Sequence, residues 1–198
     1  MQITTESIQA QIPYYLTQEA KGSLVKALNS FPRVDYYINR GYDEPLQGDG
    51  WDCLELIRFE DGDRKFVKGV LLSNSCDINP NIKRELPSKV TFVPVIRLSR
   101  YAELLANSGI GNEKIKNKIV AIKEQKVSTL FYLPQGAKLE DDYVALLDDV
   151  HTLPFVAFQA EKDQRKLFTL SQVGFYLFLL KLSVHFCRFH ENVDRSQA

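Results

Sequence analysis

Apolar residues recur along the chain with two different spacings, and the change between them separates helical from strand segments. Residues 17–31 place three apolar side chains on one side of a helix that Pro32 ends. Residues 51–59 and 65–73 have the composition of strands, and the Asp61-Gly62 pair between them is the strongest short-range signal for a hairpin. The pattern predicts an N-terminal helix followed by a β-hairpin.

The strand pattern continues after the hairpin but is interrupted once by a helical segment. Residues 89–98 predict a strand that contains Pro94, which has no N–H for a ladder, so we expect a bulge or an edge position there. Residues 99–125 return to helical spacing, and strand composition resumes at residue 126. This order predicts an α+β fold with one curved antiparallel sheet or small barrel, from residues 47–98 and 126–153, and a helical insertion over residues 99–125.

A long helix is predicted at the end of the chain, within residues 167–192, where Thr169 and Gln172 match a capping box. Apolar side chains form two stripes separated by about 200° of rotation. We expect one stripe to pack on the sheet and the other on the N-terminal helix or a second subunit, so Phe186→Asp should cause unfolding, dissociation or aggregation. The apolar stretch is too short and too interrupted to span a membrane. A polar ridge separates the stripes: Lys181, His185 and Arg188.

Composition narrows the class of partner. The 25 Lys and Arg residues balance 25 Asp and Glu residues, and this argues against binding to nucleic acid mainly through bulk charge. The lysines of the insertion have two interpretations, a solvated helix surface or a local patch for RNA or an acidic partner. These lysines are Lys114, Lys116, Lys118, Lys123 and Lys126.

The cysteines and the first residues of the chain indicate the cellular compartment in which the protein is expected. Cys53, Cys76 and Cys187 are scattered as in a protein of the reducing cytoplasm, and the chain does not begin with a signal-peptide pattern. His185 and Cys187 would point about 200° apart on a helix and cannot share a metal. We therefore expect a cytoplasmic protein without a metal or cofactor.

Two polar clusters at strand ends are candidates for chemistry, since strand ends hold side chains on a rigid support. In residues 73–77, Cys76 could act as a nucleophile, although the adjacent Asp77 tends to raise a thiol pKa. The alternative is a turn whose side chains bond to backbone amides. In residues 148–151, a carboxylate beside His151 suits acid–base chemistry, and the alternative is capping or surface solvation.

Taken together, the β-rich segments resemble the PemK/MazF toxin family of small SH3-like barrels. In that family a Gly-Asp pair opens the first strand, a hairpin leads to an apolar strand ending in Ser, the next strand carries Pro before an apolar residue, and a late Leu-Asp precedes an apolar run. The match covers about residues 47–158. The corresponding segments are Gln47-Gly48-Asp49, Gly69-Val70-Leu71-Leu72-Ser73, Val93-Pro94-Val95 and Leu147-Asp148-Asp149-Val150-His151-Thr152-Leu153.

The chain departs from this family at the residues that carry its chemistry. The family's ribonucleases use an Arg before the apolar strand and a Thr just after the Pro-containing pair, where this chain has Val67 and Ile96. Arg64 or Arg97 would supply the cation if the register shifts by a few residues. Without the cation and the hydroxyl, the family's in-line cleavage of RNA is not expected.

The sequence therefore leads to two hypotheses about function. The first is a single-domain PemK/MazF-like module of a prokaryotic toxin–antitoxin or phage-defence system, with residues 1–46 as a helical extension. It would bind RNA or, through the C-terminal helix, a partner protein or a second copy. The second is a nuclease with a relocated site. Its candidate residues are Asp49, Arg64, Cys76, Asp77 and His151.

Overall fold

The computed structural model describes residues 35–38, 44–58, 60–82 and 84–187, so the helix predicted over residues 17–31 lies outside the described part. Within that part the chain forms seven strands and four helices, and the predicted α+β class is confirmed. The strands are β1 (Gly50–Ile57), β2 (Arg64–Leu71), β3 (Lys89–Arg97), β4 (Leu130–Leu133), β5 (Tyr143–Leu146), β6 (His151–Pro154) and β7 (Lys166–Phe168). The helices are α3 (Leu98–Asn107), α4 (Asn112–Lys123), α5 (Phe155–Ala160) and α6 (Gln172–Phe186).

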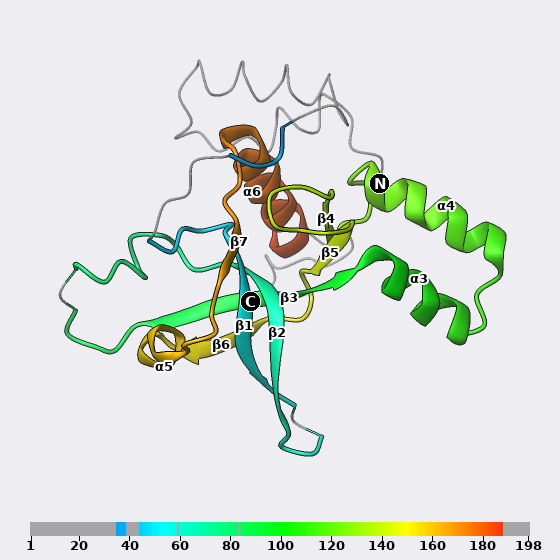
Figure 1. Cartoon of the computed structure of the whole chain (residues 1–198). Helices are drawn as coiled ribbons and strands as arrows, with labels where there is room; N and C mark the ends of the chain where they lie inside the picture. The colour runs from blue at the N-terminus through cyan, green and yellow to red at the C-terminus, as the bar shows by residue number, and fades with distance from the viewer. Residues whose placement is uncertain (1–34, 39–43, 59, 83, 188–198) are drawn as a thin grey trace, which may run out of the picture.

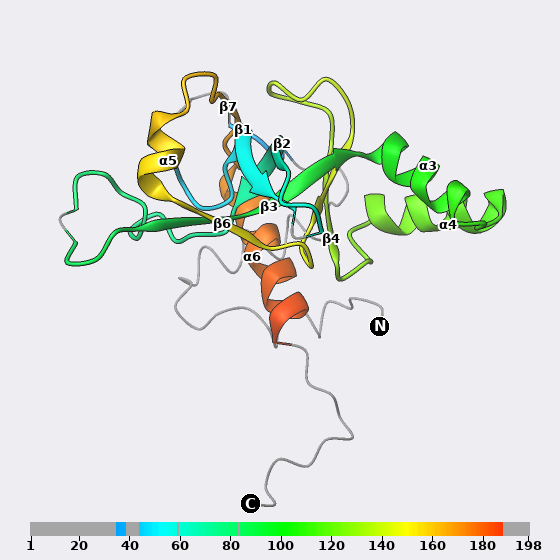
Figure 2. The same ribbon diagram turned by 90° about the horizontal axis from the view of Figure 1, so that it is seen from below.

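The strands form one antiparallel sheet in the order β4-β5-β3-β2-β1-β7, with β6 also paired to β3. The sheet is open, since the strands at the two ends of this order do not pair with each other and close no barrel. Helices α3 and α4 lie together at one side of the molecule, away from α5 (Figures 1 and 2). The predicted antiparallel sheet with a helical insertion between β3 and β4 is confirmed.

Pro94 lies in the middle of the sheet, because β3 pairs with β2 on one edge and with β6 and β5 on the other. The expected edge position is therefore wrong. The carbonyl of Thr91 accepts a hydrogen bond from the amide of Leu72, so the backbone groups of Thr91 face β2. Backbone groups alternate in direction along a strand, so those of Pro94, three residues later, face the other edge of β3, where β6 and β5 pair. On that edge β6 pairs up to Phe92 and β5 begins at Val95, and the missing N–H falls in the break between them.

The predicted hairpin joins β1 to β2 and is confirmed. Gly62 takes a φ of 74° in its turn, and Arg58 pairs there with Asp61 and Asp63. At the other end of the hairpin, the ladder shifts register between Trp51 and Leu54, which marks a bulge in β1.

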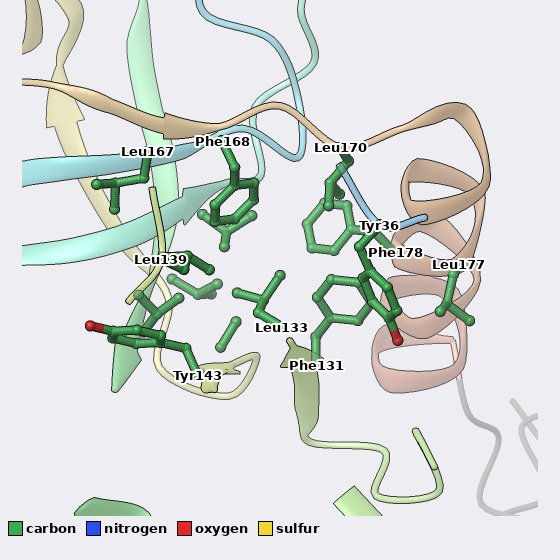
Figure 3. Packing of buried hydrophobic residues seen from close by; sticks show 14 of the residues in the cluster. Tyr36, Phe131, Leu133, Leu139, Tyr143, Leu167, Phe168, Leu170, Leu177 and Phe178 are labelled. Carbon is green, nitrogen blue, oxygen red and sulfur yellow. The ribbon is translucent and has the colours of Figure 1, made fainter. Parts of the chain in front are cut away.

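Helix α6 packs on the main core with a face that overlaps the predicted stripes only in part, since Leu177 and Leu180 of the first stripe are buried as predicted. Its buried residues include Leu177, Phe178 and Lys181, and Phe178 contacts the ring of Phe131 at a centroid distance of 5.2 Å (Figure 3). Lys181 is 1% exposed, so the prediction that it lies on a polar ridge is wrong. Phe186 is 57% exposed in the single chain, so its stripe is not fully buried within the fold, and burial of this residue against a second subunit stays a prediction.

The start of α6 also differs from the prediction. Ser171 is the N-cap, and its Oγ accepts a bond from Gly174 N at 3.0 Å, so Thr169 and Gln172 form no capping box. Thr169 is buried just before the helix. No helix of the described residues has the length and apolar character needed to cross a membrane.

Candidate functional site

Residues 73–77 form a turn after β2 that is held by its own polar side chains. Ser73 Oγ accepts a bond from the amide of Thr91 at 2.7 Å, and Ser75 Oγ accepts one from the amide of Gln47 at 2.9 Å. Asn74 Oδ1 accepts the amide of the cysteine two residues later at 2.9 Å. These bonds match the turn interpretation of the cluster.

Cys76 and Asp77 are exposed at the tip of this turn, and Arg84 joins them. The Arg84 guanidinium donates to the carbonyl of Cys76 and lies 3.4 Å from Asp77 Oδ1. Among the described residues, neither the thiol of Cys76 nor the carboxylate of Asp77 contacts a histidine. The turn therefore offers a carboxylate–guanidinium pair, without a base that would activate the thiol.

His151 opens β6 and forms its own local pair. Its Nε2 lies 2.7 Å from Asp149 Oδ1, and its ring lies 5.7 Å from the ring of Phe92. Asp149 belongs to the turn between β5 and β6. The carboxylate–histidine pair is present, but its contacts do not extend to Cys76 or Asp77.

Arg64 and Asp49 lie away from both of these clusters, one on the hairpin and the other in the interior. Arg64 Nη1 pairs with Glu55 Oε1 at 2.8 Å on the exposed hairpin. Asp49 is 0% exposed, lies 2.8 Å from Lys166 Nζ and accepts the amide of Leu46 at 2.9 Å. Burial raises the pKa of Asp49 above its ordinary value, while Lys166 and the Leu46 amide oppose that rise. Asp49 is an internal anchor between β1 and β7.

The five candidate residues are thus distributed over the interior, the hairpin, the turn after β2 and the start of β6, and their contacts link only Cys76 with Asp77, through Arg84. Sequence reasoning missed Lys166, the partner of Asp49, because β7 has only three residues and carries no periodic signal. The described residues contain no group of three or more His, Cys, Asp or Glu side chains placed to hold a metal ion.

Val67 and Ile96, which the resemblance aligns with the catalytic Arg and Thr of the toxin family, both lie in apolar surroundings. Val67 packs against the cluster around Leu54 and Phe92. Ile96 packs against a different cluster, beneath α3 and α4, which includes Ile122 and Tyr132. Neither side chain can contribute a charge or a hydroxyl to a phosphate.

The insertion formed by α3 and α4 carries both paired and unpaired lysines. Lys123 pairs with Asp142 at 2.8 Å and Lys126 with Glu124 at 2.6 Å. The remaining lysines of α4 are exposed and form no ion pair within the described chain: Lys114, Lys116 and Lys118.

A scan of the chain against protein-family models finds no match, and a search of curated proteins finds no matching relative. The resemblance to PemK/MazF proteins therefore depends on short sequence segments alone.

Proposed function

We propose that the protein is a non-catalytic binding module, with a PemK/MazF-like, SH3-like arrangement of its β-strands, that acts in a prokaryotic toxin–antitoxin or phage-defence system. The observation that carries this proposal is the packing of Val67 and Ile96 into two separate apolar clusters. In-line cleavage of RNA needs a positive donor at the phosphate, and the loss of one preorganised donor slows catalysis by about 10²–10³-fold. Here both contributions are replaced by hydrocarbon.

The surface that best supports binding is the outer side of α3 and α4. Residues 98–126 contain six Lys or Arg residues and three Glu residues, in a chain whose formal net charge is zero. Val120 is 55% exposed and Leu104 is also exposed, so each helix of the insertion leaves an apolar side chain at the surface. Exposed apolar groups within a basic surface fit an acidic amphipathic segment of a protein partner.

RNA fits this surface less well than an acidic protein segment does. Proteins that bind single-stranded RNA stack its bases on exposed aromatic rings or guanidinium groups. The insertion has one aromatic residue, Tyr101, which is half-buried against the sheet, and one arginine, Arg100, which pairs with Glu103 at 2.9 Å. An acidic protein partner is therefore the proposed ligand, and RNA is the outcome that would contradict it.

The binding test uses a synthetic amphipathic peptide of Glu and Leu and a mixed single-stranded RNA, each with a fluorescent label. Anisotropy should show that the peptide binds the wild-type protein and that the triple variant Lys114→Glu/Lys116→Glu/Lys118→Glu loses this binding. The matched control carries the same change of charge at exposed lysines elsewhere, Lys65→Glu/Lys89→Glu/Lys162→Glu, and should keep it. Binding of RNA in place of the peptide, or of neither, would refute the proposed partner.

The alternative function, a nuclease with a relocated site, is tested by incubating the protein with mixed single-stranded RNA, with and without a divalent metal. We expect no cleavage. Cleavage by the wild type that both Asp77→Ala and His151→Ala abolish would favour the relocated site. Cleavage that both variants retain would reject that site and would also show that Val67 and Ile96 are not the catalytic positions.

A further inference from the structure

A pocket of about 130 Å³ lies between the β1–β2 hairpin and α5, apart from every candidate site described above except for the Glu55–Arg64 pair at its rim. Its apolar wall includes Phe66, Leu153 and Phe158. The volume corresponds to about four water molecules, at roughly 30 Å³ each, which is the size of a small organic molecule.

The polar groups of the pocket leave negative charge uncompensated. Glu55 lines the pocket but pairs with Arg64. The carboxylate of Glu161 forms no ion pair within the described chain and accepts only the amide of Asp163, at 3.1 Å. Burial, followed by the charges of nearby carboxylates including Glu161, raises the pKa of the Cys53 thiol that lines the pocket. The raised pKa disfavours the reactive thiolate, and the negative charge of Glu161 suits the pocket to binding a cation.

A second, independent feature of the pocket is an unsatisfied amide. Gln164 lines it, and the Nε2 atom of this residue is buried without a hydrogen-bond partner in the described structure. Buried polar atoms are rarely left unpaired, and an unpaired one in the wall of a cavity indicates a missing polar partner. A hydroxyl or carbonyl oxygen on a ligand would supply it.

The backbone beside the pocket is also unusual. Cys53 has a φ of 57°, which is uncommon for a residue other than glycine, and it lies in the bulge of β1. Bulges and residues with strained backbones are each enriched at binding sites. A bulge redirects a side chain, and the strain is tolerated where the surrounding structure holds it. The strain coincides with the pocket.

We propose that this pocket binds a small organic ammonium ion that carries a hydroxyl or carbonyl oxygen. Glu161 supplies the opposite charge, the ring of Phe158 and the ring of Phe66 supply aromatic faces for the cation, and Gln164 pairs with the oxygen. Cations bound in this way gain affinity over uncharged molecules of the same shape, and that difference is the signature to measure.

The chain carries a built-in reporter for this site. Trp51 is its single tryptophan, and its ring lies 5.1 Å from that of Phe158 in an edge-to-face arrangement. Choline and ethanolamine, each added to the full-length protein, should cause a saturable change in tryptophan fluorescence. The uncharged carbon analogue of choline, 3,3-dimethyl-1-butanol, should bind about tenfold more weakly or not at all.

Variants of the protein test whether the choline response arises at this pocket. Glu161→Gln should weaken the choline response about tenfold, because it removes the charge while keeping an oxygen for the amide of Asp163. Glu140→Gln, a change at an exposed carboxylate that does not line the pocket and lies 3.8 Å from Arg97, should leave the response unchanged. In a Cys76→Ser/Cys187→Ser background, choline should also slow the alkylation of Cys53.

Three results would overturn the proposal. Equal affinity for choline and its carbon analogue would show a merely apolar cavity. A choline response that survives Glu161→Gln, without protection of Cys53, would place binding elsewhere. A protein that responds to neither choline nor ethanolamine, and whose Cys53 is not protected, would have no ammonium site here.

Discussion

Lys181 donates from its Nζ to the backbone carbonyl of Gln125 at 2.9 Å, although it lies within the core. The same ammonium group donates to the carbonyl of Val127, and both carbonyls follow directly after α4. These carbonyls belong to the loop between α4 and β4, so the lysine holds that loop against α6. Burial lowers the pKa of Lys181 to about 8.

This lysine should give the protein an unusual dependence of stability on pH. The ordinary pKa of lysine is 10.5, so between pH of about 8 and 10.5 the unfolded chain binds more protons than the folded chain, and the free energy of unfolding should rise with pH. Burial raises the pKa of Tyr36 to about 12 from 10.0, so above pH of about 10 the unfolded chain releases a proton that the folded chain retains, and stability should fall.

Urea unfolding monitored by circular dichroism at a series of pH values measures this profile. We expect the wild-type free energy of unfolding to reach its maximum close to pH 10, at about the ordinary pKa of tyrosine. The variant Lys181→Met should lose the rising limb and keep the fall at higher pH. A rising limb of the same slope in both proteins would show that another group produces it.

Gln125 should be as important as Lys181 for the packing of the insertion. It is buried, and its amide group bonds to both backbone groups of Tyr132: Nε2 donates to the carbonyl at 2.8 Å, and Oε1 accepts the amide at 3.1 Å. Gln125→Ala leaves these two buried groups unpaired, at about 1–3 kcal/mol each. Thermal unfolding should show the loss, while Gln135→Ala, at an exposed position, should change stability by no more than about 0.5 kcal/mol.

The elements that the sequence predicts correctly are those whose signal is local. The Asp61-Gly62 turn and the change of spacing over residues 99–125 each depend on neighbouring residues, and both are confirmed. The pattern places Lys181 on a polar ridge because a hydrophobic pattern counts every lysine as polar. Its partners are backbone carbonyls 54 and 56 residues away, and no side-chain pattern encodes a backbone carbonyl.

The candidate site is predicted less well for the same physical reason. Polar residues after an apolar strand identify a strand end, and residues 73–77 do lie at one. Whether two strand ends meet depends on the pairing of distant strands, which sets His151 opposite Phe92 and away from the turn. Glu161 and Gln164 have no signal at all, since they come within reach of Cys53 only through the packing of α5 on the hairpin.

Gly69 should tolerate no side chain. It faces Pro94 across the β2–β3 ladder, and an added Cβ would lie 2.8 Å from the carbonyl oxygen of Val93 and 2.8 Å from Leu54 Cδ1. Gly69→Ala should destabilise the protein by about 1–3 kcal/mol through overpacking. Gly111→Ala, where a Cβ meets nothing within 4 Å, should cost less in the same urea titration, and equal costs would contradict the close approach.

Substitutions at two phenylalanines of α6 should have very different effects on stability. Phe178 is fully buried and contacts Phe131, so Phe178→Ala should cost about 3–5 kcal/mol of stability (Figure 3). Phe186 is exposed, so Phe186→Asp should leave the melting temperature of the monomer nearly unchanged. Sedimentation of the wild type and of Phe186→Asp then tests a partner on this helix: a lower mass for the variant would show that Phe186 lies in a dimer contact.

Asp49 and Asp77, the two aspartates among the catalytic candidates, should differ in how much each contributes to the stability of the fold. Asp49→Ala removes the carboxylate that pairs with Lys166 in the interior and accepts the amide of Leu46, and breaking a buried pair costs about 3–5 kcal/mol. Asp77 has a side chain that is 67% exposed, and its pair with Arg84 lies at the surface, so Asp77→Ala should cost no more than about 1 kcal/mol.

Thermal melts of both variants beside the wild type decide the role of Asp49. A large drop in melting temperature for Asp49→Ala with little change for Asp77→Ala is the expected result, because the first carboxylate holds β1 against β7 while the second holds only a surface turn. The conservative variant Asp49→Asn keeps an oxygen for the amide of Leu46 and should recover part of the loss. If Asp49→Ala were as stable as the wild type, the buried pair would not anchor the sheet. Asp49 would then again be a candidate for a functional rather than a structural role.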